Sequence, residues 1–148
     1  MRRLLLLLPA ISGVGLALAF PDQGVFPLAW VALAPYLWFL IERPGLKTLL
    51  AGHLVFGFLY FGLVFYWIPR VLTEYGGLGV SIGVLALVVM TLLLTLLLLP
   101  LPLLIRWLAG RSVPGALLSV PGLWVALELA RNWLPFGGFP WASLGYSQ

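Results

Sequence analysis

Long apolar runs with almost no charge constrain this chain more than any other feature. Residues 80–99 contain no charged side chain at all. A helix that crosses a bilayer needs about 17–25 mostly apolar residues, because each residue rises 1.5 Å and the hydrocarbon core is about 30 Å thick. Only 8% of the residues are charged and 63% are apolar, whereas soluble domains carry about 25% charged residues. The sequence therefore predicts a membrane protein.

Several stretches approach the length of a membrane-crossing helix. Backbone polar groups in lipid must be paired, which favours helices, and the leucine-rich runs lack the alternation of barrel strands. We expect an all-α, polytopic transmembrane helix bundle of about five spans. It forms a single domain over residues 1–148, with an outer interfacial segment at 135–148. The predicted spans are residues 4–20, 26–41, 49–68, 80–99 and 116–134.

The prolines affect where the fourth span ends, and the N-terminal residues raise the question of whether the first span is cleaved. Pro100 and Pro102 are expected to end or kink the fourth span. Residues 1–20 combine a basic start, an apolar core and the sequence Ala17-Leu18-Ala19, which is also the pattern of a cleavable signal peptide. We favour an uncleaved first span. In either case the remaining spans keep the chain in the membrane.

The positions of the basic residues predict the orientation of the bundle. When the loops are numbered alternately, Arg70 and Arg131 fall on one side of the membrane. The other basic residues fall on the opposite side: Arg2, Arg3, Arg43, Lys47, Arg106 and Arg111. Basic loops stay in the cytoplasm. The N-terminus is therefore expected to be cytoplasmic and the C-terminus extracytoplasmic.

The end of the fifth predicted span holds two charged residues near lipid. Glu128 and Arg131 are three residues apart and share one face of a helix. Charged residues at membrane depth usually face a bundle interior or a wet cavity, which favours a role in substrate contact. The alternative is a pair whose long side chains reach the interface and fix the helix end. The sequence leaves both interpretations open.

The residues that follow cannot continue a helix. Gly137 and Gly138 stand beside Pro140, which predicts irregular backbone at the outer interface. Such backbone must be covered by protein or line a wet cleft. The segment also supplies Phe139, Trp141 and, further on, Tyr146 and Gln148.

Other polar residues give weaker signals. His53 stands alone in the third span, and we expect a neutral histidine that is hydrogen-bonded to a neighbouring helix. Arg70 and Glu74, four apart, can pair if that helix extends far enough. The acids are too dispersed for a metal site, so neither a metal nor a cofactor is expected. The scattered basic residues form no patch for nucleic acid.

Several segments, in order, resemble the N-terminal membrane part of the apolipoprotein N-acyltransferase family. The most specific are Gly138-Phe139-Pro140-Trp141 and Gly145-Tyr146-Ser147-Gln148. Tyr75-Gly76-Gly77 stands where the family commonly has Phe-Gly-Gly. The likeness spans nearly the whole chain. Its further segments are Leu18-Ala19-Phe20-Pro21, residues 27–35, residues 57–62, Tyr66-Trp67-Ile68, and Leu123-Trp124-Val125 with Glu128, Arg131 and Trp133.

The resemblance implies an enzyme of the bacterial inner (plasma) membrane that takes part in lipoprotein maturation. Its partners would be a phospholipid acyl donor, a diacylated lipoprotein acceptor and the lipid bilayer. The acyl chain would pass to the α-amino group of the lipidated N-terminal cysteine through a thioester on the enzyme. The family's Glu-Lys-Cys triad lies in a nitrilase-like domain, where the thiolate attacks, the glutamate moves protons and the lysine stabilises the oxyanion.

The chain departs from the family pattern in one respect that bears on chemistry. It contains no cysteine, so no catalytic residue can be assigned to it. We expect the chain alone to be inactive, with the catalytic domain supplied in cis or as a separate chain. The resemblance assigns Glu128, Arg131, Phe139, Trp141, Tyr146 and Gln148 to substrate binding at the outer mouth. The alternative is a non-catalytic membrane scaffold, a lipid-binding protein or a transporter.

Overall fold

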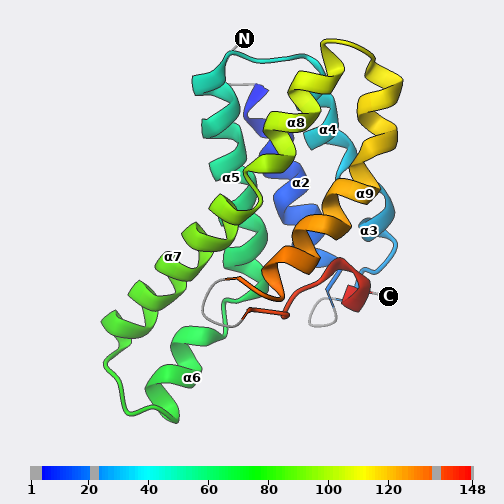
Figure 1. Cartoon of the computed structure of the whole chain (residues 1–148). Coiled ribbons are helices and arrows are strands. Elements are labelled where there is room, and N and C mark those ends of the chain that lie inside the picture. The colour runs from blue at the N-terminus through cyan, green and yellow to red at the C-terminus, as the bar shows by residue number, and fades with distance from the viewer. Residues whose placement is uncertain (1–4, 21–23, 135–137, 148) are drawn as a thin grey trace.

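A computed structural model describes residues 5–20, 24–134 and 138–147 of the chain. Every regular element in these residues is a helix (Figure 1), so the all-α prediction is confirmed. Within these described ranges, three helices are long and apolar enough to cross a bilayer, namely Leu46–Val64, Val80–Ala109 and Val113–Arg131. Leu7–Leu18 and Leu28–Ile41 are shorter apolar helical segments. How many of these cross the membrane, and in which direction, stays a prediction.

The helices run up and down between two ends of the molecule (Figure 1). The loops before α5 and before α9 lie at the end where the N-terminus is, and η1 lies at the opposite end. In chain order the elements are α2 (Leu7–Leu18), α3 (Leu28–Val31), α4 (Ala34–Ile41), α5 (Leu46–Val64), α6 (Ile68–Glu74), α7 (Val80–Leu97), α8 (Pro100–Ala109), α9 (Val113–Arg131) and η1 (Leu144–Ser147).

The core is built around α5, which packs against α2 and α7. Glycine allows these close approaches, because a Cβ at Gly13 would lie 2.6 Å from the carbonyl oxygen of Phe56. Gly57 likewise leaves room for the side chain of Thr95 on α7. Aromatic rings fill the remaining space, and the rings of Tyr36 and Phe56 stack in parallel with centroids 4.3 Å apart. Stacked aromatic pairs add to the stabilisation from burial.

Proline interrupts two of the predicted spans without ending them. The segment predicted at 26–41 is divided into α3 and α4, with Pro35 in the first turn of α4. The fourth span, predicted to end at residue 99, resumes as α8 with Pro100 in its first turn. Proline is tolerated in a first helical turn because the amide hydrogen it lacks would have no partner there. The apolar helix therefore continues to Ala109.

Two polar contacts expected from the sequence are confirmed. His53 is buried, with 1% of its surface exposed. Its Nδ1 lies 2.7 Å from the Tyr36 hydroxyl on α4, and its Nε2 lies 2.8 Å from the carbonyl oxygen of Thr95 on α7. Arg70 Nε lies 2.8 Å from Glu74 Oε1, in an exposed pair on α6. The third span's helix does not extend that far, because α5 ends at Val64, and the pair forms on the separate helix α6.

Candidate functional site

The predicted site residues lie at the end of the molecule opposite the N-terminus. Glu128 and Arg131 occupy the last turns of α9, and Phe139 and Trp141 lie in the segment that follows it. Tyr146 belongs to η1. Gln148 lies outside the described residues. The structure therefore gathers the charged and aromatic members of the set at one end of α9 and in residues 138–147, here called the return segment.

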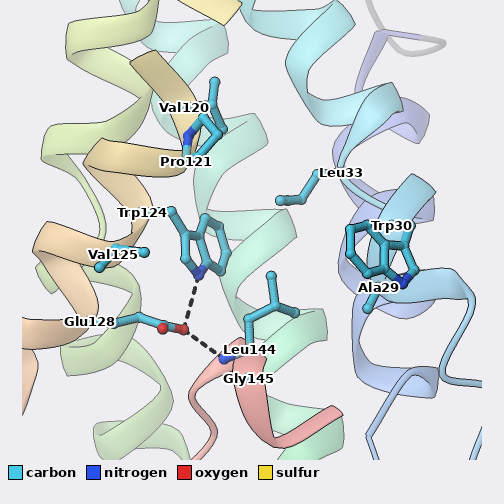
Figure 2. Close-up of a pocket in the computed structure, with 10 residues that line it drawn as sticks. All are labelled: Ala29, Trp30, Leu33, Val120, Pro121, Trp124, Val125, Glu128, Leu144 and Gly145. Carbon is cyan, nitrogen blue, oxygen red and sulfur yellow. Dashed lines mark hydrogen bonds between the residues drawn. The ribbon is translucent and has the colours of Figure 1, made fainter. Parts of the chain in front are cut away.

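Glu128 holds the return segment onto α9. Its Oε1 accepts a hydrogen bond of 2.9 Å from the indole nitrogen of Trp124, one helical turn earlier. The same oxygen accepts a hydrogen bond of 2.7 Å from the backbone nitrogen of Leu144 (Figure 2). Hydrogen bonds to an ionised acceptor are stronger than those between neutral groups. The carboxylate thus fixes both an indole ring and the start of η1.

Arg131 is buried, with 3% of its surface exposed. One terminal guanidinium nitrogen donates a 3.3 Å hydrogen bond to the Ser143 hydroxyl, and the carbonyl oxygen of Arg131 accepts a 2.9 Å bond from Phe139 N. Its Nε is buried without a hydrogen-bond partner among the described residues. This burial does not fit a side chain that reaches out to the interface. Glu128 therefore bonds to Trp124 and Leu144, and Arg131 bonds to Ser143. In the described part of the chain, the ion pair found is that of Arg70 with Glu74.

The return segment also packs on α5. The ring of Phe139 meets Phe65 edge to face, with centroids 5.3 Å apart. The hydroxyl of Tyr60 donates a 3.3 Å hydrogen bond to the carbonyl oxygen of Ala142. Trp141, in the same segment, keeps 61% of its surface exposed. The segment is therefore held from two helices while one large aromatic side chain remains available.

A cavity of about 360 Å³ opens between α9, η1 and the α3–α4 segment. In Figure 2 the indole of Trp124 and the carboxylate of Glu128 project from α9, while Trp30 and Leu33 face them from the other wall. Apart from the carboxylate, the walls are apolar or aromatic. The full lining is Ala29, Trp30, Leu33, Val120, Pro121, Trp124, Val125, Glu128, Leu144 and Gly145.

A second cavity of about 390 Å³ lies between the start of the return segment and α7. Phe139 and Gly138 form one wall, and the aliphatic side chains of α7 form the rest: Ala86, Val89, Met90, Leu93, Leu94 and Leu97. Both ends of the return segment thus border an apolar cavity, at Gly138 and Phe139 and at Leu144 and Gly145. Small apolar cavities of this kind suit hydrocarbon chains better than polar ligands.

The arrangement can bind and position, but it shows no catalytic group of its own. The described residues include no cluster of three histidine, cysteine or acidic side chains that could hold a metal. Trp124 and Trp30 line the cavity and were not among the predicted site residues. Trp124 could have been singled out, because its position four residues before Glu128 places both side chains on one helical face. Trp30 could not have been singled out, because its position opposite α9 in the cavity depends on tertiary packing.

Comparison with known proteins was informative over almost the full length of the chain. Residues 12–148 match the family described as "Apolipoprotein N-acyltransferase N-terminal domain". The apolipoprotein N-acyltransferase of Geobacter metallireducens is 42% identical over 144 residues, which is 96% of this chain and 27% of that protein. Those of Methylococcus capsulatus and Azotobacter vinelandii are each 35% identical, over 97% and 96% of this chain and 28% of each protein. The chain thus spans little more than a quarter of the relatives it matches.

Proposed function

This chain belongs to the apolipoprotein N-acyltransferase family as its N-terminal membrane domain, and from that premise we propose the role it plays. We propose that it is the membrane half of an enzyme that moves an acyl chain from a phospholipid to the α-amino group of a lipoprotein's lipidated N-terminal cysteine. The observation that carries this proposal is the match of nearly the whole chain to relatives bearing that name. The apolar helices supply the lipid-embedded part such a reaction needs.

The proposal assigns the chemistry to a part that carries the family's Glu-Lys-Cys triad, in cis or as a separate chain. This chain has no cysteine, and a thioester needs a thiolate. The 148-residue chain is therefore expected to catalyse no transfer by itself. Its contribution is to hold the donor and acceptor lipids near the membrane surface.

Within that contribution, the residues at the end of α9 take different parts. Trp141, exposed on the return segment, contacts lipid or lipoprotein substrate. Glu128 lines a cavity and sets the position of η1, while Arg131 and Phe139 fix the segment that presents Trp141. Tyr146 and Gln148 enter the proposal through the family motif alone. The acyl chains of the substrates would lie against the apolar walls beside this segment.

We further propose that the protein crosses a bacterial inner membrane about five times, with α2 and the α3–α4 segment counted as spans. The distribution of basic residues supports a cytoplasmic N-terminus. Arg43, Lys47 and Arg111 lie in or beside the loops at the N-terminal end of the molecule. Positive residues favour the cytoplasmic side, so the return segment would face outward.

A domain exchange tests the proposed function. Residues 12–148 would replace the matching part of the Geobacter metallireducens enzyme, and N-acylation of a diacylated lipoprotein would be measured in membranes. The exchanged protein is expected to transfer acyl chains, and the 148-residue chain alone is not. A stable, membrane-inserted exchange protein without transfer would contradict the proposed role of the domain. Transfer by the isolated chain would contradict the assignment of the chemistry to another part.

A matched pair of tryptophan variants in the exchanged protein tests the site. Trp141→Ala is expected to reduce acyl transfer by tenfold or more relative to the amount of protein inserted. Trp107→Ala, at the other end of the molecule, removes a ring of similar exposure that stacks on Arg111, and it should leave transfer unchanged. Equal losses from the two variants would show that Trp141 serves only as an interfacial anchor.

A further inference from the structure

Both proline-interrupted spans leave a backbone group without its helical partner inside the apolar core. In the fourth span, Leu99 N donates to the carbonyl oxygen of Leu96, at 3.1 Å. In a continuous α-helix that amide would bond to the carbonyl oxygen of Thr95, four residues earlier. Pro100 has no amide hydrogen to offer Leu96, so the Leu99 amide takes that place. The Thr95 carbonyl is released from the helical pattern.

The released carbonyl is met by the chain's single histidine. His53 Nε2 lies 2.8 Å from Thr95 O, across the α5–α7 contact. Gly57 lies one turn further along α5 and has no Cβ, so the Thr95 side chain fits against the helix backbone. The Thr95 hydroxyl bonds back to the Thr91 carbonyl at 2.7 Å, a contact that favours bending of a helix.

The second span shows the complementary case, in which an amide is released. Tyr36 N would donate to the carbonyl oxygen of Ala32 if α3 and α4 formed one helix. It donates instead to the hydroxyl oxygen of Ser12 on α2, at 2.8 Å. Pro35 stands immediately before it and breaks the helical pattern. A side chain from a neighbouring helix thus pairs with the backbone group released at this break as well.

Tyr36 links the two proline breaks through hydrogen bonds. Its amide bonds to Ser12, and its hydroxyl lies 2.7 Å from His53 Nδ1. We propose that Ser12, Tyr36, His53 and Thr95, here called the polar cluster, form one hydrogen-bonded device that makes both proline breaks compatible with the membrane and fixes α2, α4, α5 and α7 relative to one another. Each of the four residues is buried, with no more than 1% of its surface exposed.

The hydrogen-bonding capacity of the Thr95 carbonyl and of the Tyr36 hydroxyl decides which His53 nitrogen carries the proton. A carbonyl oxygen can only accept, so His53 Nε2 must carry the proton that Thr95 O receives. A charged imidazolium would be costly in this buried apolar setting, so His53 is neutral. Nδ1 is then the acceptor and the Tyr36 hydroxyl is the donor, which holds His53 in one tautomer. An unpaired backbone group in hydrocarbon is costly, which gives this arrangement a reason to persist.

Nuclear magnetic resonance tests the tautomer on the unmodified chain. Because the chain has one histidine, a ¹⁵N-histidine label in lipid bilayers gives a single pair of ring signals. At neutral pH we expect Nε2 to be protonated and Nδ1 to be unprotonated. Tyr36→Phe should shift the Nδ1 signal and leave Nε2 protonated. A proton on Nδ1, or on both nitrogens, would overturn the proposed hydrogen-bond direction.

Comparing His53→Leu in chains with and without the prolines of the fourth span tests whether His53 compensates for the proline break. His53→Leu is expected to lower the Tm of the unmodified chain by several degrees. In a Pro100→Ala/Pro102→Ala background, an amide at residue 100 becomes available to Leu96, so Leu99 can return to Thr95. There the Tm loss from His53→Leu should be at least twofold smaller. Equal losses in the two backgrounds would overturn the proposal, and if His53→Leu fails to fold, the tautomer measurement alone decides.

Discussion

At the scale of single residues, the carboxylate of Glu128 shows how a charge is placed in an apolar setting. One oxygen receives both the Trp124 indole and the Leu144 amide. Glu128 is half-buried, and a charge partly withdrawn from water is tolerated when hydrogen-bond donors surround it. Its partners come from the same helix and from the return segment, so the charge serves to join two parts of the backbone.

Replacing Glu128 is therefore expected to loosen the return segment. Glu128→Leu removes the acceptor of both hydrogen bonds and should lower the free energy of unfolding by about 1–3 kcal/mol. It should also speed proteolytic cleavage between residues 138 and 144. Glu128→Gln keeps an oxygen acceptor of the same length and should lose less than half as much stability. If the two variants are cleaved at the same rate, the hydrogen bonds do not hold the segment.

The sequence predicted that Glu128 and Arg131 share a helical face, because helical spacing alone decides that. It could not predict their partners. Leu144 contributes a backbone amide, which carries no sequence signal, and Ser143 contacts Arg131 only because the chain turns back on itself. The burial of Arg131 depends on the same turn. Such contacts follow from tertiary packing and not from residue type.

At the scale of helices, the bounds depend on local backbone chemistry that hydropathy does not report. The span predicted at 116–134 begins at Val113, because Ser112 caps it and Pro114 fits the first turn. The span predicted at 49–68 ends as α5 at Val64, and the chain then forms α6. The length of the apolar runs was sufficient to locate the apolar helices, but not α6 as a helix of its own. Caps and prolines decide where each begins and ends.

The cap on α9 gives a test at this scale. The Ser112 side chain accepts a 3.1 Å hydrogen bond from Gly115 N, which satisfies one free amide of the first turn. Ser112→Ala should lower the free energy of unfolding by about 1 kcal/mol, whereas Ser112→Asp should retain it. Chemical denaturation in detergent micelles measures the difference. Identical midpoints for the two variants would mean that α9 does not need the cap.

At the scale of the whole molecule, charge and packing divide the two ends. The loops beside the N-terminus carry Arg43, Lys47 and Arg111, while the opposite end carries the return segment and the exposed α6. The long helices leave much of their apolar surface uncovered. In water such a surface would cause association. In a bilayer it is the surface that faces lipid.

Single cysteines test the direction in which these ends face. The chain has no cysteine, so each variant carries one reporter thiol. Tyr75→Cys, at the far end and 83% exposed, should react with a membrane-impermeant thiol reagent added outside the cell. Gly45→Cys, where an added side chain meets open space, should react only after the inner face is opened. The reverse result would invert the proposed orientation.

The polar cluster also has a consequence for how homologous sequences diverge. Ser12, Tyr36 and His53 are needed because prolines at 35, 100 and 102 divide two helices, and a chain with unbroken helices would gain nothing from a buried histidine. We therefore expect these positions to covary in an alignment of the family. Lineages without the prolines should carry apolar or small residues at 36 and 53. The histidine would then mark a lineage-specific solution to helix breaking within a shared fold.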